Sequence, residues 1–271
     1  MKKVLSLIFI GIIAISLSAC GNKNSIDDNV IVVGASVSPH AEILEQTRSY
    51  IESKGYKLKI VEFTEYKLPN IGVEDESLDA NFFQHTPFLN QYNEDNNASL
   101  VAIHSVHFEP LAVYKGKSSS LDLNRGSVVG VPNDTTNEAR ALLLLDSLGL
   151  IVVDTTKGLK ATKLDILENP LNLDIIELES AIIPSKLQDL DIAVINGNVA
   201  LTSKITDKVI PNSSEDTSSI SAKTYANVIA VKDKYKDKEA IKILIEAFKQ
   251  ENVIEYINNT YNGLVIPFSD N

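Results

Sequence analysis

The chain has 271 residues, of which 44% are hydrophobic and 23% are charged, with 36 acidic residues against 25 basic ones. The formal net charge of −11 argues against nucleic acid and anionic lipid as partners, because both repel an acidic surface. The hydrophobic fraction argues against a disordered chain, and the length suits one large domain or two medium ones.

The N-terminus predicts an export signal. Lys2 and Lys3 precede an apolar stretch, residues 4–15, and a small-residue segment LSAC that ends at Cys20. A membrane-spanning helix needs about 20 apolar residues, and the sixteen residues between the lysines and the cysteine fall short of that length. The LSAC segment also resembles a bacterial lipobox. We therefore expect residues 1–19 to be a signal peptide and Cys20 to carry lipid.

Cys20 is the only cysteine in the sequence, so no intramolecular disulfide and no redox pair can form. More than one acyl chain on this residue would hold the protein at the cell membrane, facing the cell surface or periplasm. The polar residues 20–29 predict a flexible tether. Loss of the signal peptide leaves 23 basic residues against 36 acidic ones, a formal net charge of about −13.

Beyond the tether, short apolar runs alternate with helical patterns. The run VIVVGAS, residues 30–36, predicts a buried strand, and Ser38-Pro39 predicts the start of a helix that stops at Gly55. Further strands are predicted at 56–63, 127–132, 190–197 and 225–231, and further helices at 136–148 and around Ile241, Leu244, Ile245 and Phe248. This alternation predicts an α/β fold with largely parallel sheets.

The segment SLDANFFQHTPFL, residues 77–89, combines three phenylalanines with an asparagine, a glutamine and a histidine, and Asp79 is its only charge. A core would contain the rings without the amides, and a surface loop would contain the amides without the rings. A small-molecule pocket needs both, so this segment is a candidate pocket wall.

A second candidate is a helix with a cation near its start. Thr135 and Glu138 have the spacing of a capping box, and Gly149 suits the helix end. Arg140 then lies near the positive end of the helix dipole, where a cation needs an anion to neutralise it. Local sequence leaves two possibilities open: a clamp for a ligand carboxylate, or an arginine that reaches solvent while its stem covers neighbouring leucines.

Amides provide the third set of candidates. The residues NGN, 196–198, follow a predicted buried strand, whose carboxyl end is where α/β proteins place ligands. Asn-Gly is also a common hairpin turn, and the local signal favours that turn. Asn227 interrupts an apolar strand and needs a partner if buried. Rings, a cation and amides together suit the zwitterion of an amino acid.

Enzyme signatures are missing from the sequence: it contains no Walker A pattern, dinucleotide fingerprint, H-E-x-x-H or G-x-S-x-G. His85, His104, His107 and Glu109 raise the possibility of a metal site. On a strand, however, His104 and His107 would point to opposite faces, and the set lacks a diagnostic spacing. We therefore predict a protein that is not an enzyme and that holds no metal and no cofactor.

From the lipobox to its last residues, the chain resembles the NlpA/MetQ family of methionine-binding lipoproteins, which are the substrate-binding components of ABC importers. The matching segments stand in family order and cover nearly all of the sequence after the signal peptide. They are VGASVSPHAEIL, EFTEYKLPN, LDANFFQHTPFL, VHFEPLAVY, VPNDTTNEARALLLL, ENPLNLDIIELE, AVINGNVAL and YANVIAV.

The resemblance implies a two-lobed, periplasmic-binding-protein-like α/β fold of type II with a ligand cleft between the lobes. The first lobe would comprise 30–110 plus 230–271 and the second 115–224. The chain would cross between them near 110–114 and 225–230, and hinge closure would enclose the ligand.

It also implies roles for single residues. The positions that wall the side-chain pocket in the family match Tyr66, Phe83, His85 and Phe88. The carboxylate-binding arginine matches Arg140, with Asn137 beside it, and asparagines that hold the ligand's backbone groups match Asn196 and Asn227. Two departures fall near the pocket: Phe88 stands where a tyrosine is frequent, and Asn198 is followed by valine where an aromatic residue is common.

The expected function is capture of methionine, or a close derivative, and its delivery to an ABC permease and its ATPase. Two other possibilities remain open from the sequence. The ligand could be a methionine-containing dipeptide or another small amino acid. The chain could also belong to another class, as a surface adhesin or an enzyme-like lipoprotein.

Overall fold

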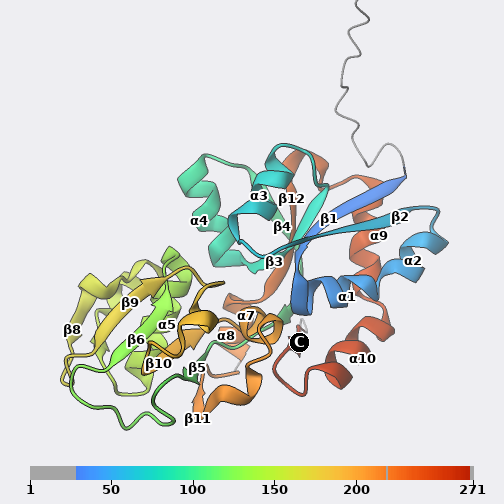
Figure 1. Cartoon of the computed structure of the whole chain (residues 1–271). Helices are drawn as coiled ribbons and strands as arrows, with labels where there is room; N and C mark the ends of the chain where they lie inside the picture. Colours follow the sequence, from blue (N-terminus) through green and yellow to red (C-terminus); the bar gives the residue numbers. More distant parts are fainter. Residues whose placement is uncertain (1–28, 218, 269–271) are drawn as a thin grey trace, which may run out of the picture.

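A computed structural model describes residues 29–217 and 219–268, so the predicted signal peptide, Cys20 and all but the last residue of the predicted tether lie outside the described part. The described chain forms two sheets with helices around them, arranged as two lobes (Figure 1). The predicted α/β class and two-lobed architecture are confirmed.

The first lobe is built on a six-stranded sheet with the order β13-β4-β12-β3-β1-β2. Its strands are β1 (Val30–Ser36), β2 (Lys57–Phe63), β3 (Ala80–His85), β4 (Leu100–Phe108), β12 (Asn227–Lys232) and β13 (Ile266–Pro267). Strand β1 is parallel to β2 and β3, whereas β12 is antiparallel to both of its neighbours. The sheet is therefore mixed and not largely parallel, because β12 returns from the other lobe and enters in the opposite direction.

Helices cover both faces of this sheet (Figure 1). They are a π-helical turn (Val37–Ala41), α1 (Glu42–Glu45), α2 (Arg48–Ser53), α3 (Lys67–Glu74), α4 (Thr86–Asn96), a 3-10 turn (Asp233–Tyr235), α9 (Glu239–Phe248) and α10 (Glu251–Thr260). The amphipathic pattern predicted for α9 is confirmed, since Ile241, Leu244 and Phe248 are buried in the core with Phe82 of β3. Ser38 has an extended backbone, the conformation of a residue that precedes a helix and of one before proline, so the backbone agrees with the predicted helix start at Ser38-Pro39.

The second lobe is built on a five-stranded sheet with the order β11-β5-β10-β6-β9 and a small two-stranded sheet. Its strands are β5 (Ala112–Lys115), β6 (Val128–Pro132), β7 (Val152–Val153), β8 (Ile166–Glu168), β9 (Asp174–Leu178), β10 (Ile192–Ile195) and β11 (Val209–Ser214). Its helices are α5 (Thr135–Ser147), α6 (Ile183–Lys186) and α7 (Gly197–Thr202), with 3-10 turns at Thr155–Lys160, Lys163–Asp165 and Thr206–Lys208. Leu142 and Leu145 anchor α5 in the core of this lobe.

The chain passes between the sheets twice. Residues 109–111 connect β4 to β5, and residues 215–226, which include α8 (Ser219–Thr224), connect β11 to β12. The second passage was predicted near 225–230, but β12 pairs within the six-stranded sheet from Asn227 onward. The two passages are bonded to each other, because the Glu215 amide donates to the Leu111 carbonyl at 2.8 Å.

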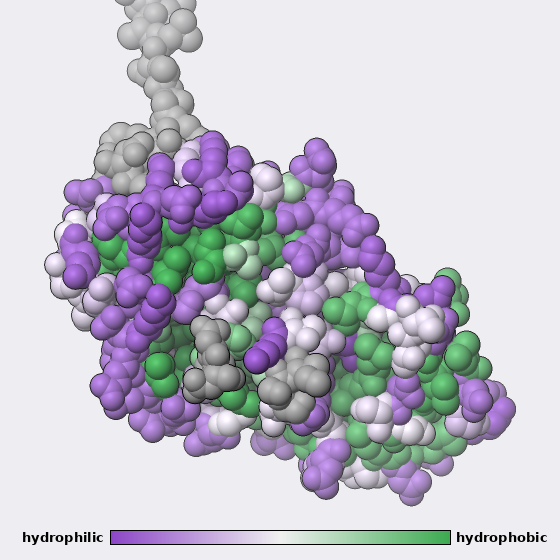
Figure 2. All heavy atoms as spheres, turned by 180° about the vertical axis from the view of Figure 1, so that it is seen from behind, coloured by the Kyte–Doolittle hydropathy of each residue, from purple (hydrophilic) through white to green (hydrophobic). Residues whose placement is uncertain are grey.

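Seen from behind, hydrophilic side chains cover much of the rim of the molecule, and hydrophobic ones show between them on both lobes (Figure 2). Within the described ranges, none of the helices combines the length and the hydropathy that crossing a bilayer requires.

Candidate functional site

One cavity lies where the two lobes meet. All eight predicted ligand-binding residues line it: Tyr66, Phe83, His85, Phe88, Asn137, Arg140, Asn196 and Asn227. Five further residues complete the lining, and they are Gln84, Glu109, Leu111, Gly197 and Asn198. The lining thus comes from the first lobe, from the second lobe and from the first passage between them.

Three aromatic rings form one wall of this cavity. The ring centroids of Tyr66, Phe83 and Phe88 lie 5.8–6.0 Å from one another, within the range of favourable edge-to-face contacts. Successive strand residues point to opposite faces, so Phe82 enters the core while Phe83 faces the cavity. The Tyr66 hydroxyl donates to Asn198 Oδ1 at 2.8 Å and so links the two lobes.

His85 is a second link between the lobes. Its Nδ1 accepts the Phe88 amide at 3.1 Å and caps α4, so Nε2 carries the proton and donates to Asn137 Oδ1 at 3.2 Å. Burial, with the nearby positive charge of Arg140, lowers the pKa of His85 to about 3. The imidazole is therefore a neutral donor at physiological pH.

The start of α5 differs from the prediction. Asp134, and not Thr135, is the N-cap, and its carboxylate accepts both the backbone amide and the side-chain amide of Asn137. Glu138 accepts the backbone amide of Lys163 instead of reaching back to the cap. The predicted capping box is thus wrong by one residue, because aspartate caps a helix as well as threonine does. The cap also holds Asn137 toward the cavity.

Arg140 is buried, with 3% of its side chain exposed, so the interpretation as a solvent-reaching arginine is wrong. Its Nε and Nη2 donate to the two carboxylate oxygens of Glu215 at 3.0 and 2.5 Å, and the guanidinium lies 4.0 Å from the centre of the Tyr225 ring. The anion that this position requires is therefore Glu215, in the second passage. Local sequence carried no signal for it, because the two residues are 75 positions apart.

The NGN segment starts a helix and not a hairpin. Asn196 is the N-cap residue of α7, directly after β10, so the predicted hairpin turn is wrong. Gly197 is required here by a close approach: a Cβ at this position would lie 2.9 Å from Glu109 Oε2. The amides of Asn196 and Asn198 consequently reach the cavity at the carboxyl end of a strand, the position that α/β folds favour for ligands.

Hydrogen-bond logic fixes the orientation of two cavity amides. A carboxylate only accepts, so Asn137 Nδ2 faces Asp134 and Asn137 Oδ1 accepts from Asn196 Nδ2 at 3.0 Å. This leaves Asn196 Oδ1 as a buried acceptor without a partner among the described residues. Asn227 Oδ1, in turn, accepts from His40 Nε2 at 2.9 Å.

The four groups weighed as metal ligands do not come together. His107 and Glu109 meet at 2.7 Å, whereas His85 caps α4 and His104 lies against Phe248. His107 and Glu109 instead form a cluster with His40, which the sequence did not single out. One possible ligand atom from each of these three residues lies within 4.8 Å of the other two. In this arrangement the ring nitrogens that face the cluster hydrogen-bond to Asn227 and Glu109.

Two α/β lobes joined by two passages, with rings, a guanidinium and amides around one cavity at the junction, define a solute-binding protein. The sequence profile of the NlpA lipoprotein family matches residues 31–269, and the chain belongs to that family. It is 38% identical over 254 residues to the D-methionine-binding lipoprotein MetQ of Salmonella typhimurium, with 92% of each chain covered. It is 34% identical to the methionine-binding lipoprotein MetQ of Bacillus subtilis, with 100% of both chains covered.

Solved structures agree. A nutrient-binding protein from Burkholderia cenocepacia bound to methionine has a TM-score of 0.82 at 37% identity, covering 88% of this chain and 100% of its own. The lipoprotein Tp32 from Treponema pallidum has a TM-score of 0.82 at 35% identity, covering 88% of this chain and 99% of its own.

Proposed function

We propose that the protein is the membrane-anchored receptor of an ABC importer, and that it binds methionine in the interlobe cavity without chemical conversion. The observation that carries this proposal is the convergence of Arg140 and the aromatic wall on one cavity. The binding of methionine by a structural relative and the names of the MetQ relatives support the choice of ligand.

Arg140 binds the ligand's carboxylate in this proposal. Glu215 occupies Nε and Nη2 of the guanidinium, so Nη1 is the nitrogen that remains for the ligand. Asn137, Asn196 and Asn227 bind the other backbone atoms of the ligand from the lining of the cavity. Polar groups of this kind, fixed in advance by their own hydrogen bonds, supply the specificity for an amino acid.

The side chain of methionine lies against Tyr66, Phe83 and Phe88. A thioether next to aromatic ring edges gains about 0.3–1.5 kcal/mol for each contact. One methylene changes the binding free energy by only about 1–3 kcal/mol, so ring placement selects methionine over its analogues less sharply than the polar groups select amino acids.

The remaining parts of the proposal concern the cell. Cys20, outside the described residues, carries the lipid that anchors the protein on the outer side of the cytoplasmic membrane. Its partners are then the permease and the ATPase of the importer.

A thermal-shift panel tests the ligand class. The protein is unfolded, dialysed and refolded to remove any carried-over ligand, and then mixed with each amino acid, both enantiomers of methionine, and methionine-containing dipeptides. A ligand at a hundred times its dissociation constant adds about 2.7 kcal/mol to the free energy of unfolding. We expect methionine to give the largest shift. A panel in which no amino acid or dipeptide raises the melting temperature would refute the receptor function.

A double variant tests the role of the arginine. Arg140→Met with Glu215→Leu removes both charges of a buried pair, a change that is often neutral or stabilising for the fold. We expect methionine affinity to fall by roughly 100-fold, since the ligand's carboxylate loses its charged partner. Calorimetry measures the affinity, and urea denaturation verifies the fold. Unchanged affinity in a folded double variant would show that Arg140 does not bind the carboxylate.

A further inference from the structure

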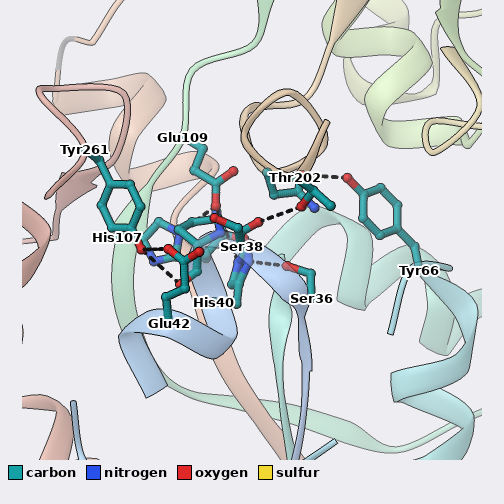
Figure 3. Close-up of polar contacts among 12 residues, drawn as sticks. Ser36, Ser38, His40, Glu42, Tyr66, His107, Glu109, Thr202 and Tyr261 are labelled. Atoms are coloured by element: carbon teal, nitrogen blue, oxygen red, sulfur yellow. Dashed lines mark hydrogen bonds and ion pairs between the residues drawn. The ribbon is translucent and has the colours of Figure 1, made fainter. Parts of the chain in front are cut away.

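A buried carboxylate faces the cavity from the first passage between the lobes. Glu109 is 6% exposed and lines the cavity together with Arg140. Its Oε1 accepts from His107 Nε2 at 2.7 Å, and His40 Nε2 lies 3.5 Å from the same oxygen. Figure 3 shows the two imidazoles and this carboxylate pointing toward one another. The carboxylate is therefore held in place from the side of the first lobe.

The second lobe holds it from the other side. The backbone of Gly197 lies so close to the Glu109 carboxylate that a Cβ at position 197 would be 2.9 Å from Oε2. The backbone of Asn198 acts to lower the pKa of the Glu109 carboxyl group, against the larger effect of burial, which raises it. Contacts from both lobes thus fix one position for this group at the edge of the cavity.

Glu109 lacks a full cationic partner. Burial lowers the pKa of His40 to about 4 and that of His107 to about 3, so both imidazoles are neutral at physiological pH. The charge of Arg140 is matched by the bidentate contact with Glu215. A buried carboxylate without a counter-charge is unfavourable, and a ligand cation next to it would remove that cost.

A second acceptor belongs to the same lining. Asn196 Oδ1 is buried and has no hydrogen-bond partner among the described residues, and its orientation follows from the chain of bonds through Asn137 to Asp134. A carboxylate without a matched counter-charge and an amide oxygen without a donor are suited to an ammonium group, which has three donors and no acceptor.

We infer that Glu109 and Asn196 Oδ1 bind the α-ammonium group of the ligand, and that His107 is a positioning residue for the Glu109 carboxylate. This rests on the proposed function and deepens it, because it makes a free ammonium group a condition of tight binding. His40 positions the neighbouring group: its Nδ1 is bonded to the Ser36 hydroxyl at 2.6 Å, and its Nε2 donates to Asn227.

The test compares methionine with 4-(methylthio)butanoate, the same molecule without its amine, by calorimetry at pH 7. We expect the wild-type protein to prefer methionine strongly. In Glu109→Gln we expect methionine affinity to fall by roughly 100-fold and the affinity for the amine-free analogue to stay the same or rise, because only methionine loses a charged partner. Glu179→Gln is the matched control, since Glu179 lines a neighbouring pocket and not this cavity.

The outcomes separate the two claims. A wild-type protein that binds no amino acid refutes the proposed function. A wild-type protein that binds methionine, with a Glu109→Gln variant that keeps the wild-type preference over the amine-free analogue, overturns the ammonium site alone. Equal losses for both ligands in Glu109→Gln also overturn it, because they indicate general damage to the cavity.

Two variants of His107 test the positioning. Glutamine retains an N–H donor for Glu109, whereas leucine removes it. We expect His107→Gln to keep most of the preference for methionine over the amine-free analogue, and His107→Leu to reduce it by roughly tenfold. A purely structural role would lower both affinities together and leave their ratio unchanged, which would overturn the positioning role.

Discussion

Arg140 shows how a buried charge depends on residues that are distant in the sequence. The sequence placed this cation at the unfavourable end of a helix dipole and left its partner open, and the partner is Glu215, 75 residues further on. The Leu111 amide donates to the same carboxylate at 2.9 Å, so the guanidinium is tied to both passages between the lobes. A ligand that binds Arg140 would therefore contact a residue that is tied to both passages between the lobes.

Glu215→Gln is expected to change stability and affinity in opposite directions. Breaking one side of a buried ion pair costs about 3–5 kcal/mol, so the ligand-free protein should lose roughly that free energy of unfolding. The ligand's carboxylate then supplies the missing charge, and affinity for methionine should rise by about tenfold. Urea denaturation with and without methionine measures both effects. An equal loss of stability in the two conditions would contradict this account.

At the scale of single elements, the start of α5 couples stability to the site. Asp134 caps the helix through the Asn137 amide and also holds the Asn137 side chain, which accepts from His85 and Asn196. One carboxylate thus orients the amide that connects β3 of the first lobe with the β10–α7 junction of the second.

Asp134→Ala should therefore lower the free energy of unfolding by about 1–2 kcal/mol and weaken methionine binding several-fold. Thr135→Ala is the matched control: it alters the residue that the sequence pattern favoured as the cap, and it should change stability by less than about 0.5 kcal/mol. Urea denaturation and calorimetry on both variants check this. A larger loss in Thr135→Ala than in Asp134→Ala would show that the cap is wrongly assigned.

The elements themselves were largely predictable, because β1, β6, β10 and β12 are mainly apolar runs, and β2 combines apolar and charged residues in a strand-like pattern. Their directions were not. The antiparallel pairing of β12 depends on where the chain crosses between lobes, which no local pattern encodes. The NGN segment was predicted as a hairpin turn for a related reason. Asn-Gly favours a turn locally, whereas here the glycine is needed because residue 197 packs closely against Glu109, which lies far away in the sequence.

At the scale of the whole molecule, the eight residues predicted to bind the ligand line one cavity. Local sequence patterns identified these residues only weakly, and the resemblance to the family decided which of them to predict. His40 and Glu215 were missed because each matters only through a partner far along the chain, Asn227 in one case and Arg140 in the other. Such pairs carry no spacing signal. The binding role of the eight residues stays a prediction for the experiments above.

Stability should fall as the pH drops below neutrality. Burial lowers the pKa of His40 to about 4 and those of His85 and His107 to about 3, from 6.5. The unfolded chain binds protons below pH 6.5 that the folded protein does not, so stability present above 6.5 is lost as the pH falls toward 4. Between pH 7 and 5 each histidine accounts for about 2 kcal/mol.

Glu109 acts in the opposite sense. Burial raises the pKa of Glu109 in the folded protein, so the folded state binds a proton at a higher pH than the unfolded chain does. This carboxyl group therefore stabilises the fold as the pH falls, and it offsets part of the stability that the histidines lose on acidification. Urea denaturation of the ligand-free protein at pH 7 and pH 5 measures the sum. His85→Asn should show a smaller drop than the wild type. An unfolding free energy that stays constant between the two pH values would contradict the prediction of neutral buried histidines.

The place of β12 also governs the order in which the protein can fold. This strand lies between β3 and β4 and is among the last to be synthesised. In a nascent chain that ends before residue 227, β3 and β4 therefore lack the strand that joins them, and each has an unpaired edge. Closing that sheet requires contacts between distant parts of the chain, which form slowly. The first lobe can therefore be completed only once the C-terminal region of the chain is available to supply β12.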